Sequence, residues 1–254
     1  MIRRFGELAG FALLVTVLVV VPVASTMADT SAASYHWARK RSQFTLKVGD
    51  NVSGDWNTYL RRAISDWNKN DTVTLDKVGG GTRPQDCNPT KGRVEVCNWP
   101  YGTQKGWLGL TRLYFNNQGD HIEAVTVQLN DSFLYAPNSR YNNNAARRHT
   151  ICHELGHSIG LEGHDDNRSC MNDSQYAVFN YVSPIRRDFR ELEQIYSHRD
   201  GDTTVSSATV TGEGFVAPVP VPSVPSEGEA SETVTVQKLD NGGTVVTYII
   251  WAKE

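Results

Sequence analysis

Residues 153–160 read His-Glu-Leu-Gly-His-Ser-Ile-Gly and combine two imidazoles, one carboxylate and a glycine at fixed spacing. Side chains four positions apart project from the same face of an α-helix, so His153 and His157 can both bind one metal ion. Glu154 lies about 100° round the helix from His153, near such a metal but not forced to ligate it. The arrangement predicts a catalytic zinc site in which Glu154 is the general base for a zinc-activated water.

The residues around this motif predict a helix packed on a core. Ile151, Leu155 and Ile159 recur every four residues and predict an apolar face. Gly160 has no Cβ, so it can end the helix in a left-handed conformation and turn the chain back toward the metal. Two histidines one turn apart also occur on helix surfaces and in structural metal clips. Glu154 favours catalysis, because a purely structural site needs no base.

Length and composition predict one ordinary globular domain with extensions. The chain has 254 residues, a formal net charge of -3 and 39% hydrophobic residues. The arginine pairs at 61–62, 147–148 and 186–187 fall in or beside predicted helices, where scattered basic residues are typically solvated. We therefore expect no nucleic-acid partner.

The first residues have the pattern of a secretory signal peptide. Residues 1–28 begin with Arg3 and Arg4, continue through an apolar run over residues 8–23 and end in small residues. The alternative is an uncleaved membrane anchor, because the run approaches the roughly 18 to 20 residues that span a bilayer. Either route predicts a secreted or extracellular protein that meets a membrane only through this segment. Residues 29–43 form a short segment without cysteine, so no cysteine-switch propeptide is expected.

Four cysteines in an exported chain predict two disulfides. Four cysteines allow three pairings. We expect Cys87–Cys97, which closes a short loop, and Cys152–Cys170, which ties the zinc helix to the segment beyond it. A cysteine-ligated zinc is disfavoured, because the sequence contains no Cys-x-x-Cys pair.

Apolar periodicity places the main α+β domain at residues 44–200. A stripe at helical spacing predicts a core-packed helix from Trp56 to Trp67, and Ser183 with Pro184 is expected to open a later helix. Strands are predicted at residues 44–48, 73–75, 107–115 and 122–129. The last is a candidate edge strand beside the metal, where an extended peptide could pair. A plain buried strand fits its pattern equally.

Beyond residue 200 the periodicity ends. Residues 201–231 contain Pro218, Pro220, Pro222 and Pro225 and predict an extended linker. Residues 232–254 predict a β-hairpin tail that is too small to be stable alone. We therefore expect that removing everything after residue 200 leaves peptide hydrolysis nearly intact.

Residues 44 to about 197 resemble the metzincin clan of zinc endopeptidases, most nearly its small secreted bacterial matrixin-like or snapalysin-like members. The resemblance rests on residues 153–160 and on Ser169-Cys170-Met171-Asn172, which looks like the methionine turn of that clan. It implies a small mixed twisted sheet, a zinc-binding active-site helix, the methionine turn and a C-terminal helix. It also implies that Met171 forms an apolar floor beneath the metal.

The resemblance is incomplete at the third metal ligand. The clan places this ligand three residues after the motif glycine, and Gly163 stands there, followed by His164 and Asp165. We expect His164 to be the third zinc ligand through a one-residue bulge, because imidazole suits zinc. Asp165 is the alternative ligand, since some relatives use aspartate.

The sequence thus predicts a secreted, monomeric, zinc-dependent endopeptidase that acts on proteins or peptides. The alternative is an exported protein that binds zinc without catalysis, as a binding module or a cell-surface interaction module. Hydrolysis by the wild type beside Glu154→Gln distinguishes the two, because only an enzyme depends on the base.

Overall fold

The computed structural model describes residues 35–115, 121–166, 168–205, 232–240 and 242–253. The predicted signal peptide and most of the predicted linker lie outside these residues. All the described residues belong to one unit of the chain. Among their helices, none combines the length and apolar character that a membrane span requires.

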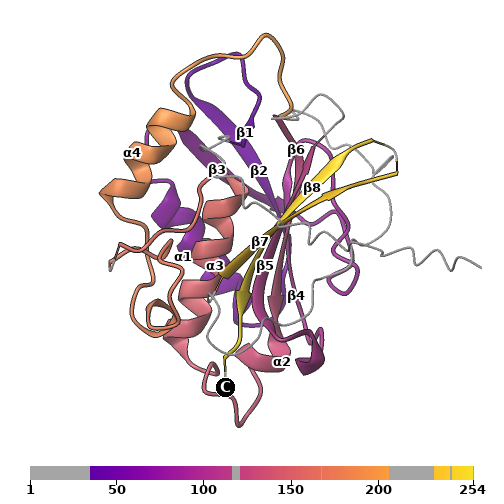
Figure 1. Cartoon of the computed structure of the whole chain (residues 1–254), viewed down its shortest axis with the longest axis vertical. Helices are drawn as coiled ribbons and strands as arrows, with labels where there is room; N and C mark the ends of the chain where they lie inside the picture. Colours follow the sequence, from indigo (N-terminus) through magenta and orange to yellow (C-terminus); the bar gives the residue numbers. More distant parts are fainter. Residues whose placement is uncertain (1–34, 116–120, 167, 206–231, 241, 254) are drawn as a thin grey trace, which may run out of the picture. The chain divides into compact units, whose positions relative to one another are not determined.

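The described strands form one mixed, twisted sheet (Figure 1). They are, in chain order, β1 (His36–Trp37), β2 (Phe44–Asn51), β3 (Val73–Gly79), β4 (Val94–Trp99), β5 (Trp107–Phe115), β6 (His121–Asn130), β7 (Glu232–Lys238) and β8 (Thr244–Trp251). The order across the sheet is β3-β2-β4-β6-β5-β8-β7, and β1 pairs with the start of β6. Parallel pairing joins β2, β3, β4 and β6, whereas β5, β8 and β7 pair antiparallel.

The longer helices lie on one side of this sheet in Figure 1. The helices are α1 (Trp56–Trp67), α2 (Asp131–Leu134), α3 (Asn144–Ser158) and α4 (Arg186–Ile195), with short 3-10 turns η1 (Thr103–Lys105) and η2 (Ala177–Phe179). The predicted stripe of α1 is buried, which confirms its core-facing role. The indole of Trp67 donates a hydrogen bond of 2.9 Å to the carbonyl of Cys152, so α1 holds α3 in place.

The C-terminal hairpin is present but is not a separate tail. β8 pairs with β5 along most of its length, and β7 pairs with β8. Ile249, Ile250 and Trp251 are buried. The expectation that residues 232–254 stand apart from the catalytic domain is therefore wrong, because the hairpin extends the sheet and shares its core. The sequence could not show this, since alternation predicts a strand but not its partner.

Three further details of the structure differ from the sequence patterns. β6 is not an edge strand, because β4 and β5 pair with its two sides. The glycine triplet at residues 79–81 and the first cysteine pair favour a long irregular connection, but β4 forms within this stretch and nearly all of its residues are buried. The helix expected to open at Ser183 begins at Arg186 instead, where the carboxylate of Asp188 accepts a hydrogen bond from the backbone N–H of Ile185.

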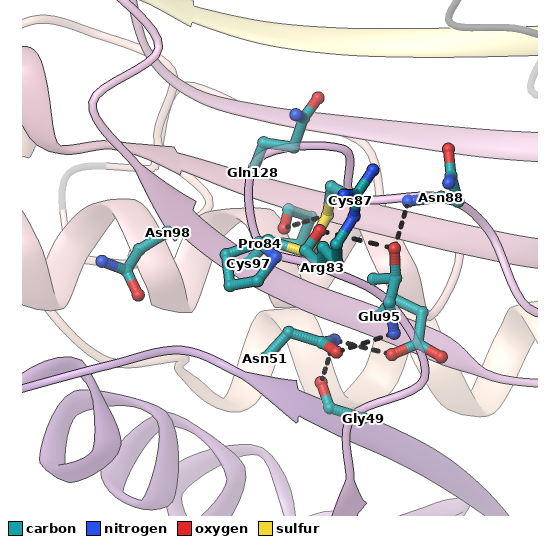
Figure 2. Close-up of a disulfide and its surroundings, with 12 residues drawn as sticks. Gly49, Asn51, Arg83, Pro84, Cys87, Asn88, Glu95, Cys97, Asn98 and Gln128 are labelled. Carbon is teal, nitrogen blue, oxygen red and sulfur yellow. Dashed lines mark hydrogen bonds between the residues drawn. A yellow bond between two sulfur atoms is a disulfide. The ribbon is translucent and has the colours of Figure 1, made fainter.

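The loop before β4 is anchored by a disulfide and a buried carboxylate (Figure 2). Cys87 and Cys97 form the first predicted disulfide, with a Cα–Cα distance of 6.0 Å. Glu95 is fully buried, accepts a hydrogen bond of 2.7 Å from the Asn51 amide and pairs with Arg93 at 2.8 Å. These contacts fix the glycine-rich loop, which explains why a regular buried strand can follow it.

Candidate metal centre

Helix α3 brings the motif residues to the middle of the domain. Its N-terminus is capped by the Asn143 side chain, which accepts a hydrogen bond of 2.9 Å from the backbone N–H of Ala146. After its last turn Gly160 adopts a φ of 96°, as the sequence predicts for the chain reversal. A Cβ at Gly160 would lie 2.3 Å from the carbonyl oxygen of Tyr35, so the N-terminal segment also requires glycine there.

The two motif histidines present matching nitrogen atoms. The Nδ1 atom of His153 lies 2.8 Å from the carbonyl oxygen of Cys170, and that of His157 lies 2.8 Å from the carbonyl oxygen of Leu161. A carbonyl only accepts hydrogen bonds, so both Nδ1 atoms carry the proton. Both Nε2 atoms are buried without a hydrogen-bond partner. This tautomer and orientation is the one that metal-binding histidines adopt.

The third group at this site is Glu232, at the start of β7. Its Oε1 atom lies 2.8 Å from His157 Nε2 and 3.5 Å from His153 Nε2. Burial alone would raise the pKa of Glu232, but the two adjacent imidazoles hold it below its ordinary value. Together the three residues form a group whose ligand atoms lie within 4.8 Å of one another.

A cation is the simplest way to satisfy these atoms. If Nδ1 holds the only proton of each ring, then each Nε2 atom is an acceptor that faces another acceptor, the carboxylate oxygen. Two acceptors 2.8 Å apart repel each other unless a positive charge lies between them. One divalent metal ion would serve both histidines and Glu232, so the residues present fit zinc.

Gly163 explains why Glu232 can reach this position. A Cβ at Gly163 would lie 2.2 Å from Glu232 Oε2, so the carboxylate fills the space that a side chain at residue 163 would occupy. Residue 163 is the position at which the resemblance implies the third ligand. The missing side chain is thus matched by a carboxylate from a distant strand.

His164 does not join the metal-binding group in this structure. Its Nε2 atom lies 2.8 Å from Asp188 Oδ1, and its Nδ1 atom accepts a hydrogen bond from the backbone N–H of Asp166. Both ring nitrogens are therefore engaged away from His153 and His157. The side chain of Asp165 is fully solvent-exposed and lies 3.8 Å from the Arg187 guanidinium. The bulge expected for His164 does not form, because the chain at 164 is fixed by backbone hydrogen bonds with Met171 and Asp173.

Glu154 points into the same buried region. Its Oε2 atom accepts a hydrogen bond of 2.5 Å from the Thr111 hydroxyl on β5, and its Oε1 atom is buried without a hydrogen-bond partner. Burial raises the pKa of Glu154 to about 8, against the opposing effects of His153 and Thr111. One oxygen is therefore held by the sheet, while the other is available to a reacting group.

The segment that follows α3 packs beneath the site. Cys152 and Cys170 form the second predicted disulfide. Met171 is fully buried, and a Cβ at Gly156 would lie 2.2 Å from its sulfur atom, so the thioether packs against the helix between the two histidines. The methionine and the disulfide fix the carbonyl of Cys170 that orients His153.

The hairpin also covers the site. The ring of Tyr248 stacks on His157 with centroids 4.1 Å apart and an interplanar angle of 12°. His153, Glu154 and His157 are all 0% exposed. Sequence reasoning missed both Glu232 and Tyr248, which occur in an ordinary alternating strand pattern. Only the glycine at position 163 indicates that a ligand must come from elsewhere in the chain.

Comparison with known proteins leaves the family open. Neither a protein-family model nor a curated protein sequence matches this chain. Among solved structures, the chain is similar to high choriolytic enzyme 1, a hatching enzyme zinc-protease from Oryzias latipes (medaka fish). The match has 12% identity and a TM-score of 0.36, and it covers 66% of this chain and 97% of the other. A similarity at this level decides neither fold nor activity, so the function of this chain has to be inferred from its own residues.

Proposed function

We propose that this protein is a zinc-dependent peptidase in which His153, His157 and Glu232 hold the metal. The observation that carries the proposal is the convergence of two buried Nε2 atoms and a buried carboxylate oxygen without hydrogen-bond partners. The adjacent Glu154 distinguishes this group from a structural site, since a structural zinc is normally enclosed by four ligands and needs no base. Two disulfides agree with an exported protein.

The chain's residues have separate roles in peptide hydrolysis. A bound zinc ion supplies Lewis acidity toward the scissile carbonyl and the attacking water. Glu154 takes the proton from that water on its free Oε1 atom and passes it to the departing amine. Thr111 holds the second oxygen of Glu154 and so keeps the carboxylate aimed at the reaction site. The carbonyls of Cys170 and Leu161 keep both imidazoles in the required tautomer.

The exposed edge strand of the sheet favours a peptide as the substrate class. β7 is the outer strand, and Val234 and Val236 on it are exposed at 54% and 60%. An extended peptide can pair with such an edge. Because Glu232 begins this strand, a paired peptide would pass close to the metal-binding group. Glu154 is fully buried in the described conformation, so a bound peptide would require a rearrangement near the site that leaves Glu232 beside the two histidines.

The test is digestion of an unbiased peptide library by zinc-loaded protein and by Glu154→Gln. We expect the variant to keep its zinc and to lose hydrolysis by about 10²- to 10⁴-fold or more, because it lacks the base. Glu193→Gln, an exposed glutamate on α4, is the matched control and should retain full activity. Equal activity in Glu154→Gln would exclude the mechanism. Wild type that binds zinc but cleaves no peptide would instead support a non-catalytic binding module.

A further inference from the structure

A second group of imidazoles lies apart from α3. His36 on β1 and His121 on β6 are direct partners in the parallel pairing of these strands. His198 and Asp200 belong to the segment that follows α4. Three parts of the chain that are distant in sequence therefore place three imidazoles and one carboxylate together.

The imidazole nitrogens of this second group surround one carboxylate oxygen, Asp200 Oδ1. The Nε2 atoms of His36 and His121 each lie 3.4 Å from Asp200 Oδ1, and the Nε2 atom of His198 lies 3.3 Å from it. The Nε2 atoms of His36 and His198 are 3.1 Å apart. With zinc bonds of about 2.0 to 2.1 Å, ligand atoms at the corners of a tetrahedron lie about 3.3 Å apart. The three distances to Asp200 Oδ1 and the His36–His198 distance match that spacing, and the ligand atoms of His36, His121 and Asp200 all lie within 4.8 Å of one another.

We propose that His36, His121, His198 and Asp200 bind a second zinc ion, distinct from the one at the motif histidines. Hydrogen bonds alone do not satisfy this arrangement. A carboxylate oxygen has two lone pairs, so Asp200 Oδ1 cannot accept good hydrogen bonds from three imidazoles at once. A central cation satisfies all four ligand atoms together. Three imidazoles and one carboxylate in a tetrahedron suit zinc better than the harder cations that prefer oxygen ligands.

The surroundings of Asp200 support this assignment. Its other oxygen, Oδ2, accepts hydrogen bonds of 2.9 Å from the backbone N–H of Arg39 and 3.1 Å from the Arg39 guanidinium. These bonds turn Oδ1 toward the three imidazoles. An outer partner that orients a ligating carboxylate is a regular feature of protein metal sites. The side chains of Asp200 and His36 are 6% and 8% exposed, whereas that of His198 is 47% exposed.

Four protein ligands leave no coordination position for a substrate, so the second site is structural. It joins β1, β6 and the segment after α4. The second site is also connected to α3. The indole of Trp37, next to His36, donates a hydrogen bond of 2.8 Å to the carbonyl of Ser158 at the end of that helix. The second zinc thereby anchors the strand that holds the metal-binding helix at its C-terminal end.

The experiment measures zinc per chain after dialysis, in the wild type, His198→Ala, His121→Ala and His153→Gln. We expect about two zinc ions in the wild type and about one in each variant. Arg199→Ala, an exposed residue between two ligands, is the matched control and should keep both. Zinc content equal to that of the wild type in both His198→Ala and His121→Ala would overturn the proposal and show a hydrogen-bonded ion cluster instead. The His153→Gln arm reports separately on the proposed catalytic metal.

A second measurement identifies the ligand directly. His198→Cys, loaded with cobalt in place of zinc, should show a thiolate-to-cobalt charge-transfer band that the cobalt-loaded wild type lacks, because cysteine is also a tetrahedral zinc ligand. Since His198 is nearly half exposed, this substitution should not disturb folding. Absence of the band in a folded, cobalt-binding variant would place the metal elsewhere and contradict the proposal.

Discussion

At the scale of single residues, the candidate site has a carboxylate from a distant strand where the resemblance implies a ligand at residue 163. Gly163 offers no side chain, and Glu232 from β7 fills the space beside it. His164, the neighbouring alternative, is engaged with Asp188 and Asp166. The proposed metal-binding set therefore includes a residue about seventy positions from the motif.

If Glu232 takes the place of a ligand at residue 163, then zinc binding should be lost without Glu232 and restored by a histidine at residue 163. Glu232→Ala should weaken zinc binding at the motif histidines by at least the roughly 10- to 100-fold that loss of an outer partner causes. Adding Gly163→His to this variant should restore binding, because the new side chain enters the space that Glu232 leaves. The measurement is a competitive zinc titration. Gln237→Ala on the same strand is the control.

His164→Ala decides between the two candidate ligands. We expect it to retain the motif zinc, since its imidazole lies against Asp188 in the structure. Loss of zinc in His164→Ala together with retention in Glu232→Ala would return the third-ligand role to His164.

At the scale of elements, the C-terminal hairpin is part of the domain that contains the candidate site. β8 occupies the antiparallel side of β5, and Tyr248 on it stacks on His157. The hairpin is therefore part of the sheet, covers the site and supplies the proposed third metal ligand.

Removal of residues 232–254 should therefore destabilise the protein and abolish its motif zinc. Several large buried side chains leave with the hairpin, and truncation of one such residue to alanine alone costs about 2 to 5 kcal/mol. The check is chemical denaturation beside Val236→Thr, an exposed hairpin position that should unfold as the wild type does. A truncated protein that folds and keeps its metal would restore the separate-tail interpretation.

The Cys152–Cys170 disulfide can be tested for the same two properties, stability and zinc binding. Replacing Cys152 and Cys170 together by alanine should lower the free energy of unfolding by about 2 to 4 kcal/mol. It should also weaken the motif zinc, because the carbonyl of Cys170 orients His153. Denaturation and zinc titration measure the two effects. Unchanged zinc affinity would show that Met171 and its neighbours hold the carbonyl without the disulfide.

At the scale of the whole molecule, sequence patterns predict local elements far better than their partners. The helix of the motif, the stripe from Trp56 to Trp67 and strand 107–115 follow from periodicity, because each pattern is complete within the element. Glu232 and the second group of histidines could not be found in this way. Their members lie on separate strands and loops, and only the folded sheet brings them together.

The two proposed metal sites differ in exposure, which predicts an order of zinc loss. His198 is 47% exposed, whereas the motif histidines are 0% exposed. A chelator added to fully loaded protein should therefore remove the second zinc first, with peptide hydrolysis declining in a later phase. To measure both phases, chelation is stopped at a series of times, and each sample is analysed for zinc content and for peptide hydrolysis. Simultaneous loss would show that opening of the whole domain controls release.

The position of Glu232 in the chain also governs when the protein can become active during its own synthesis. A ribosome makes α3 and both motif histidines long before it makes β7. Until the hairpin emerges and joins the sheet, the nascent domain has two of its three proposed ligands and lacks the strand that completes its core. In the proposed peptidase, the metal site would therefore be completed only after β7 has been made and has joined the sheet.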